Sequence, residues 1–246
     1  MTFAYFERMY DLLKKVETEE AEAIEKAVEL MVDATEKKKS VFAFGANHAG
    51  ILTQELFYRA GGMMTINPIF GKEVLLDVEP VTRTSHMERL VGYGTAIANQ
   101  TPFSEGDVLI VHSVSGRNPV TIELAMEAQK KGVRTISITN LEYSKSVSSR
   151  HPSGKNLYEY SDVVIDNHGD VGDAACDIEG LEQKVGPSST VIGATIVNTI
   201  VVETVQRLVE RGLEKPPIFY SANLDGGDAL NRELFEQYKD SIHYRF

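Results

Sequence analysis

Short apolar segments alternate with longer segments of helical periodicity along most of this chain, and this alternation limits the fold more than any other feature. The segments Ser40–Phe44, Asp107–Val111 and Arg134–Thr139 have the length and the apolar, β-branched content of buried strands. Segments with apolar residues at helical spacing lie between them. Strands that are separated by helices form parallel sheets with helices on both faces. The sequence therefore predicts an α/β fold.

The predicted sheet has five strands, because Met63–Ile66 and Asp162–Ile165 also have strand character. The predicted helices carry apolar residues on one side, and they are Phe3–Lys38 with a break near Glu17–Glu20, His48–Ala60, Pro119–Lys131, Ser188–Arg211 and Gly227–Tyr238. Two connections, Asn67–Gly106 and Asn167–Pro187, are too long to be simple links. We expect a single domain, a three-layer flavodoxin-like sandwich with N-terminal helices (1–38), a core (40–212) and a C-terminal helical extension (213–246).

The composition excludes several classes of protein. The formal net charge is −11, so we expect no basic surface for nucleic acid. The single cysteine, Cys176, allows no internal disulfide and no multi-cysteine zinc site. The first residues lack the basic and apolar regions of a signal peptide, and no apolar stretch reaches the ~20 residues that span a bilayer. We expect a cytoplasmic protein without a membrane segment.

The loop after the strand Asp107–Val111 has the residue types of an anion site. Ser113 and Ser115 supply hydroxyl groups, and Gly116 lets the backbone approach a ligand closely. Asn118 stands at the expected N-cap of the next helix, with Pro119 at its first position. Backbone N–H groups and the helix dipole then favour a phosphate. Simple capping of the helix by Ser115 and Asn118 explains the same residues.

Two further polar segments stand at equivalent places. Gly45-Ala46-Asn47-His48-Ala49-Gly50 follows the first strand, but it lacks the glycine spacing of a dinucleotide site. Asn47 and His48 can hydrogen-bond a sugar there, and packing or capping is the alternative for His48. The segment Gly186–Thr190 opens a long helix with three hydroxyl residues, Ser188, Ser189 and Thr190. Because loops at the carboxyl ends of parallel strands converge, all three segments are expected at one edge of the sheet.

The order of these loops resembles the sugar isomerase (SIS) domain family, which binds phosphosugars on a five-stranded parallel sheet and is marked by a Ser-x-Ser-Gly-x-Ser/Thr loop. Ser113, Ser115 and Gly116 match that loop, and Asn118 replaces its last hydroxyl. The resemblance covers residues 1–212. It implies a phosphosugar ligand held by Asn47, His48, Ser113, Ser115, Gly116, Asn118, Ser188, Ser189 and Thr190.

Within the family, the chain is most similar to a poorly characterised bacterial subgroup. The shared stretches are Glu55–Gly62, Ser115–Pro119, Asp166–Gly169 and Ser221–Gly227. That subgroup has Gly-x-Gly-His-Ser-His in the first loop, where this chain has Ala49 and Gly50 instead of the last Ser and His. An altered substrate or activity is the expected consequence.

Aldose–ketose isomerisation needs a group that moves a proton next to a carbonyl, and Glu and His are the usual ones. The candidates are His168, Glu55 and Glu123, together with His86 and Glu88 in the first long connection. His168 is favoured because it lies in a long loop directly after a strand. Glu55 and Glu123 also fit exposed helix carboxylates.

Three functions therefore compete. The first is a sugar-phosphate isomerase that works through an enediolate without a cofactor. The second is a non-catalytic phosphosugar sensor, and the third is a lyase or deaminase-type enzyme on the same fold. The acidic residues Asp166, Asp170, Asp173 and Asp177 beside His168 do not match a calcium loop, and we expect no metal. The resemblance implies a homodimer or homotetramer, with Ser221–Gly227 reaching the site of another subunit.

Overall fold

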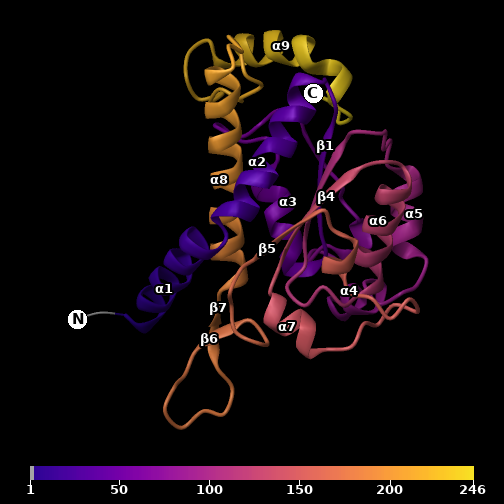
Figure 1. The fold of residues 1–246 in the computed structure, drawn as a ribbon, viewed down its shortest axis with the longest axis vertical. Helices are drawn as coiled ribbons and strands as arrows, with labels where there is room; N and C mark the ends of the chain where they lie inside the picture. Colours follow the sequence, from indigo (N-terminus) through magenta and orange to yellow (C-terminus); the bar gives the residue numbers. More distant parts are fainter. Residues whose placement is uncertain (1–2) are drawn as a thin grey trace.

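A computed structural model describes residues 3–246, in which a parallel sheet forms the centre of the molecule. Its strands run in the order β2-β1-β3-β4-β5, and they are β1 (Val41–Gly45), β2 (Ile66–Pro68), β3 (Val108–His112), β4 (Arg134–Thr139) and β5 (Val163–Asp166). This order is that of flavodoxin-like folds. The predicted α/β class with five parallel strands is confirmed (Figure 1).

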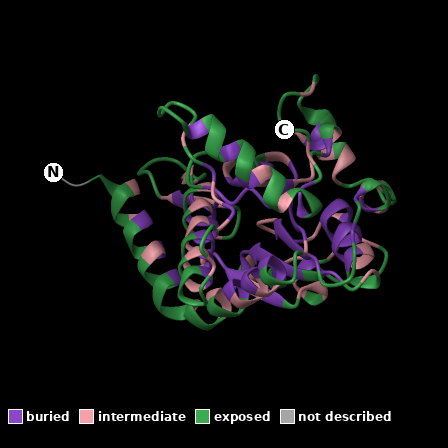
Figure 2. Cartoon of the chain, turned by 90° about the horizontal axis from the view of Figure 1, so that it is seen from above, coloured by how far each residue is buried: buried purple, intermediate pink, exposed green. Residues whose placement is uncertain are grey.

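Successive strand residues face opposite helix layers. Val41 and Ala43 pack with one set of helices, whereas Phe42 and Phe44 pack with the other. The first layer contains α1 (Ala4–Glu19), α2 (Ala21–Glu36), α3 (Ile51–Leu56) and α8 (Ser189–Glu210). The second contains α5 (Tyr93–Gln100) and α6 (Pro119–Lys130). Figure 2 shows the buried residues between these layers.

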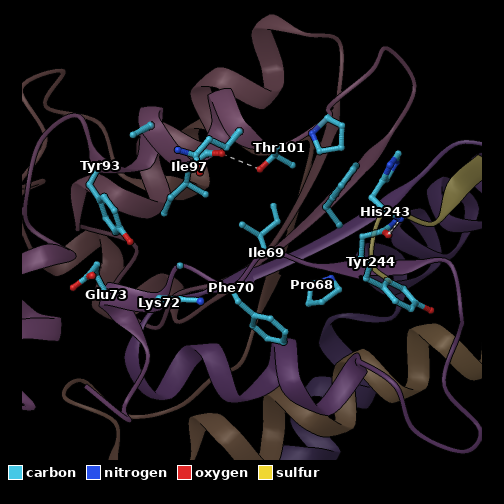
Figure 3. Close-up of a pocket in the computed structure, with 16 residues that line it drawn as sticks. Pro68, Ile69, Phe70, Lys72, Glu73, Tyr93, Ile97, Thr101, His243 and Tyr244 are labelled. Carbon is cyan, nitrogen blue, oxygen red and sulfur yellow. Dashed lines mark hydrogen bonds between the residues drawn. The ribbon is translucent and has the colours of Figure 1, made fainter. Parts of the chain in front are cut away.

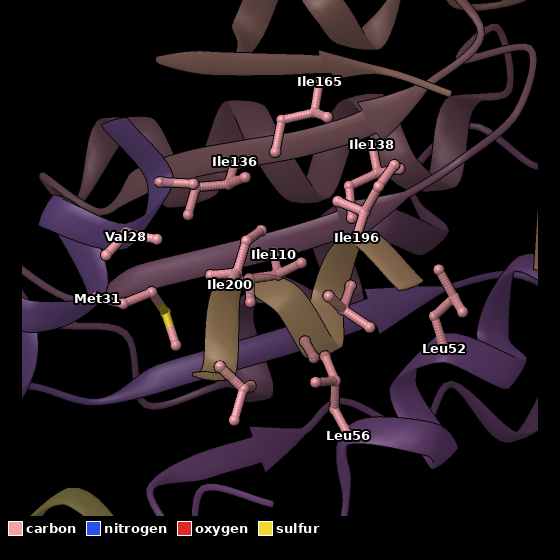
Figure 4. Packing of buried hydrophobic residues seen from close by; sticks show 14 of the residues in the cluster. Val28, Met31, Leu52, Leu56, Ile110, Ile136, Ile138, Ile165, Ile196 and Ile200 are labelled. Carbon is pink, nitrogen blue, oxygen red and sulfur yellow. The ribbon is translucent and has the colours of Figure 1, made fainter. Parts of the chain in front are cut away.

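Helix α8 is the main apolar helix of the first layer. Ile200 lies beside Ile110 and Ile196 beside Ile138 of the sheet, and Met31 of α2 belongs to the same cluster (Figure 4). Among residues 3–246 it is the one helix long and apolar enough to cross a membrane. The sequence pattern does not single out this segment as one of such length and apolarity. Its inward face is part of the core, as expected of the central helix of an α/β layer.

The predicted strand Met63–Ile66 is wrong, because β2 begins only at Ile66. Residues before it pair with the C-terminal part of the chain instead. Met63 forms a bridge with Ile218, and the N–H of Met64 donates to the carbonyl of Pro217 at 2.7 Å. Residues 63 and 64 therefore pair with residues 217 and 218, more than 150 positions later in the sequence, and not with the sheet.

Most predicted helices are found with shifted ends. The first breaks at Glu20 as expected, and α9 (Gly227–Tyr238) has the predicted bounds. The helix predicted at His48–Ala60 is shorter: it begins with the 3₁₀ turn η1 (Asn47–Gly50) and ends at Leu56. Further short elements are α7 (Leu141–Ser146), η3 (Leu157–Tyr160) and η4 (Lys239–Ser241).

Both long connections are ordered. The first contains η2 (Lys72–Val74) and α4 (Thr82–Met87) in addition to α5. The second contains an antiparallel hairpin of β6 (Ala174–Cys176) and β7 (Val185–Pro187), which projects beside the start of α8 (Figure 1). The hairpin is a structure that the sequence pattern does not predict.

Candidate functional site

In the loop 113–118 after β3, several carbonyl groups are hydrogen-bonded within the protein, whereas a run of amide groups is not. Three of its carbonyls accept hydrogen bonds from other segments: that of Val114 from Asn140 N–H at 2.9 Å, that of Gly116 from Leu157 N–H at 2.8 Å, and that of Arg117 from Arg150 N–H at 2.9 Å. The N–H groups of residues 115–118 have no acceptor among residues 3–246. A run of unpaired N–H groups at a residue with left-handed φ, here Gly116 at +60°, binds anions.

The side chains of this loop do not serve as helix caps. Asn118 is the N-cap residue of α6 but makes no capping hydrogen bond, and its Oδ1 accepts from Arg150 Nη1 at 2.8 Å. The hydroxyl groups of Ser113 and Ser115 have no hydrogen-bond partner among the described residues, and both side chains are partly exposed. Capping therefore does not explain why the loop carries these residues, and they stay available to a ligand.

The first loop folds back onto the end of β1. A Cβ atom at Gly45 would lie 2.3 Å from the carbonyl oxygen of Ala49, so only glycine fits there. Asn47 has a left-handed φ of 55°, and its buried Oδ1 has no partner within residues 3–246. His48 is exposed. Of the two predicted sugar contacts in this loop, Asn47 is the one that the fold holds in a fixed, partly buried position.

His112, the last residue of β3, closes the floor between this loop and α8. It is 2% exposed, and its Nδ1 lies 3.2 Å from the carbonyl oxygen of Ala49. Burial lowers the pKa of His112 to about 4. The imidazole is therefore neutral at physiological pH, with Nδ1 as the hydrogen-bond donor to Ala49.

Glu88 follows α4 and joins the first loop to the serine loop. Its carbonyl accepts from Val120 N–H at 3.2 Å, which fixes the segment against the start of α6. Burial raises the pKa of the Glu88 carboxyl above its usual value. Polar contacts with the side chains of Asn47 and Asn118 act in the opposite direction and are the weaker effect. A half-buried carboxyl group between two loops at a sheet edge has the position and pKa shift of a proton-transfer group.

Glu123 differs from the exposed carboxylate that its helix pattern allows. It is 4% exposed, and its Oε1 accepts from Gly92 N–H at 2.6 Å while Oε2 accepts from Thr95 N–H at 3.2 Å. These two amides open α5, so the carboxylate compensates unpaired N–H groups and the dipole at that helix start. The reading of Glu123 as solvated is wrong, because α5 packs on α6 and covers it.

His168 and Glu55 each contact a neighbouring helix. His168 Nε2 lies 2.9 Å from Oε1 of Glu20, which stands at the junction of α1 and α2. The backbone N–H of His168 donates to Asp166 Oδ1. Glu55 forms an ion pair with Arg59 and accepts from Asn198 of α8 at 3.0 Å. The structure therefore does not bring these two side chains into hydrogen-bond contact with Glu88 or with the serine loop.

The hydroxyl segment that opens α8 is engaged by Asp173. Asp173 Oδ1 accepts from Ser189 N–H at 2.8 Å, and Oδ2 accepts from Ser189 Oγ at 2.7 Å. Ser188 Oγ also lies 3.4 Å from the same carboxylate. A carboxylate from the β6–β7 segment thus occupies the anion position of this helix. Thr190 is partly exposed and makes no side-chain hydrogen bond within residues 3–246.

The loops after β3, β4 and β5 are linked through one residue. The N–H of Asn140 donates to Val114, and its Nδ2 donates to the carbonyl of Gly169 at 2.5 Å. These hydrogen bonds join the loops after three neighbouring strands, which is a different set from the three segments that the sequence predicts to converge. Of those three, the first loop and the serine loop both contact Glu88. The segment Ser221–Gly227 lies instead beyond the far end of α8 (Figure 1).

A separate cavity of about 510 Å³ lies on the β2 side of the sheet. Ile69, Ile97 and Tyr93 line it, with His243 and Tyr244 from the C-terminal segment (Figure 3). No residue of the serine loop or the first loop borders it. This cavity is therefore separate from the site formed by the polar loops.

Known proteins resemble this chain both in sequence and in fold. The SIS domain family matches residues 4–140. A UPF0309 protein of Shouchella clausii is 51% identical over 240 residues, covering 98% of this chain and 97% of that protein. A phosphoheptose isomerase from Francisella tularensis has a similar fold, with a TM-score of 0.55 and 15% identity over 82% of this chain and 95% of that one.

The fold is also shared with the Vibrio vulnificus NanR protein, which was solved with ManNAc-6P. Its TM-score is 0.51 at 18% identity, and the match covers 95% of this chain and 66% of that one. At such identities the likeness concerns the fold alone. The sequence matches go further, because one spans more than half of the chain and the other nearly all of it. The chain belongs to the SIS domain family and, within it, to the UPF0309 group of proteins.

Proposed function

We propose that this protein binds a phosphosugar and holds its phosphate in the loop 113–118. The observation that carries the proposal is the orientation of the loop: three of its carbonyls are bonded away from the ligand space, and the N–H groups of residues 115–118 are left unpaired within residues 3–246. The hydroxyl groups of Ser113 and Ser115 add further donors. Membership of the SIS domain family supports a sugar as the rest of the ligand.

We further propose that the protein is an aldose–ketose isomerase in which Glu88 moves the proton. The carboxylate of Glu88 takes the proton from the carbon next to the carbonyl, which gives an enediolate, and returns it to the former carbonyl carbon. The proton of the neighbouring hydroxyl passes to the former carbonyl oxygen, so the atoms balance. Oxidation at one carbon balances reduction at the other, so the reaction needs no cofactor. A carboxyl group whose pKa is raised by burial is a stronger base than an exposed one. His168, Glu55 and Glu123 remain candidates, but each contacts other protein groups.

The test is solvent isotope exchange. A set of sugar phosphates is incubated with the protein in heavy water, and deuterium at the carbon next to the carbonyl is followed by NMR. We expect exchange with the substrate, at least about 100-fold slower in Glu88→Gln. Glu55→Gln is the matched control and should keep the wild-type rate within about threefold if Glu88 is the base.

Two results would redirect the proposal. Exchange at the wild-type rate in Glu88→Gln would remove Glu88 from the mechanism. A sugar phosphate that stabilises the protein yet shows no exchange and no cleavage would favour the non-catalytic sensor, whereas cleavage of an ether or amine substituent would favour the lyase or deaminase. In either case the phosphate site itself would stand.

We also propose that the protein is a cytoplasmic homodimer or homotetramer. Exposed aromatic side chains follow one face of α1, namely Phe3, Phe6 and Tyr10, and α8 exposes Val202. Contact with a second copy would bury these residues, and it could bring Ser221–Gly227 to a neighbouring site. Light scattering of the purified chain tests this: a monomeric mass at micromolar concentration would contradict it.

A further inference from the structure

The eleven arginines of this chain differ in whether they pair with a carboxylate. Six of them form ion pairs with carboxylates, and they are Arg8, Arg59, Arg83, Arg134, Arg207 and Arg211. Five arginines form no ion pair with any carboxylate of residues 3–246, although the chain carries 36 acidic residues. Arg232 and Arg245 lie in the C-terminal segment, whereas Arg89, Arg117 and Arg150 belong to the part of the chain around the serine loop. In so acidic a protein, three arginines without a partner at one place call for an explanation.

These three arginines surround the proposed site. Arg150 Nη1 donates to Asn118 Oδ1 at 2.8 Å, and its N–H donates to the carbonyl of Arg117 at 2.9 Å. Arg117 Nε donates to the carbonyl of Ser148 at 2.9 Å. Arg89 directly follows Glu88 in the chain, and its side chain has no hydrogen-bond partner among the described residues. The guanidinium groups thus come from three separate segments. Those of Arg117 and Arg150 are fixed beside the serine loop by these hydrogen bonds, and the charge of Arg89 acts on Arg150.

The cluster has an electrostatic cost. The charges of Arg89 and Arg117 lie close enough to Arg150 to lower the pKa of its guanidinium, together with a larger effect of partial burial. Glu88 acts in the opposite direction, but it does not reach ion-pair distance of any of the three. Grouped like charges destabilise the unliganded protein unless an anion joins them. The loop amides already suit one phosphate, so the arginines offer more positive charge than that phosphate needs.

We propose that the ligand carries, besides the phosphate bound by residues 113–118, a second anionic group that binds to Arg89, Arg117 and Arg150. This inference rests on the proposed phosphosugar function and narrows its substrate class to sugar bisphosphates or phosphorylated sugar acids. Arginine binds phosphate and carboxylate through paired N–H groups, so both chemistries suit the cluster. From the net charge of −11 alone, one would expect a second anionic group to weaken binding, because the field of the whole protein disfavours each added negative charge.

The experiment compares the dissociation constants of three ligands by calorimetry at fixed ionic strength. Fructose 6-phosphate carries the phosphate alone, fructose 1,6-bisphosphate adds a second phosphate, and 6-phosphogluconate adds a carboxylate. We expect at least one of the last two to bind about tenfold more tightly than fructose 6-phosphate. The ligand that binds more tightly shows whether the second anionic group is a phosphate or a carboxylate.

Two variants assign the effect to the cluster. Arg89→Gln should reduce the tenfold preference to less than about twofold, because it removes one donor pair without removing a contact of the serine loop. Arg232→Gln, at an exposed position of α9 without an ion pair among the described residues, removes the same charge elsewhere and should keep the preference.

Several outcomes would overturn the inference. If fructose 6-phosphate binds and Ser115→Ala weakens it, but neither doubly anionic ligand binds more tightly, the second-anion site is wrong and the phosphate site stands. If the preference persists in Arg89→Gln, or is lost equally in Arg232→Gln, the arginine cluster does not produce it. If none of the three ligands binds and no other sugar phosphate stabilises the protein, both the inference and the proposed function fail.

Discussion

The carbonyl oxygen of Gly116 accepts a 2.8 Å hydrogen bond from the backbone N–H of Leu157, so the carbonyl points away from the amide groups beside it. The left-handed φ of +60° at Gly116 makes this orientation possible. A Cβ atom at this position would also lie 3.0 Å from Ser144 Oγ. One glycine therefore sets which polar groups the loop presents.

Gly116→Ala should lower the free energy of unfolding by about 1–2 kcal/mol and weaken sugar-phosphate binding at least about tenfold. The backbone must either stay strained or turn its carbonyl toward the ligand. Urea unfolding measures the first effect and calorimetry the second. Gly212→Ala is the matched control, since Gly212 has a φ of +90° with no atom within 4 Å of the added Cβ. Equal binding by wild type and Gly116→Ala would count against the loop as the phosphate site.

Glu123 is expected to act on stability. Glu123→Ala leaves the partly buried N–H groups of Gly92 and Thr95 without acceptors, which should reduce the free energy of unfolding by about 2 kcal/mol. Glu55→Ala, on a partly exposed side chain, should cost less than about 1 kcal/mol. Urea unfolding compares the two. If Glu123→Ala unfolds like the wild type but loses isotope exchange, Glu123 is a proton-transfer group and its capping role is unimportant.

The stability of the protein should depend on the titration of His112. Its pKa is about 4 in the folded state and about 6.5 in the unfolded chain, so the unfolded chain binds a proton that the folded state excludes. The contribution of His112 is full above pH 6.5 and falls as the pH drops toward 4, by up to about 3 kcal/mol.

Comparison of wild type with His112→Gln isolates this contribution from that of the carboxylates. The difference between their free energies of unfolding should shrink as the pH is lowered from 7.5 to 4. A constant difference between wild type and His112→Gln over this range would show that His112 does not titrate as its burial requires.

The parts of the fold that follow from local pattern are predictable from sequence. Strand Arg134–Thr139 and helix Gly227–Tyr238 have the predicted bounds, because strand character and helix periodicity fix them locally. The pairing of Met63 with Ile218 is not predictable in this way. It depends on a contact between distant segments, and a short apolar run carries no information about its partner.

The site shows the same division. Ser113, Ser115 and Gly116 can be selected from sequence because their loop has a recognisable pattern between a strand and a helix. Glu88 can be named only as one carboxylate among several, since its place between two loops depends on how the first long connection folds. The hydrogen bond from Ser189 to Asp173 depends on the β6–β7 hairpin, which no local sequence pattern indicates.

The most direct test of the central claim is the thermal stability of the protein with a sugar phosphate and with the same sugar lacking phosphate. At a concentration of 100 times the dissociation constant, the phosphorylated ligand should stabilise the wild type by about 2.7 kcal/mol. The free sugar should have little effect, and Ser115→Ala should lose most of the stabilisation while its own unfolding changes by less than about 0.5 kcal/mol. Stabilisation by the free sugar but by no sugar phosphate, or full stabilisation of Ser115→Ala, would contradict a phosphate site in the loop 113–118.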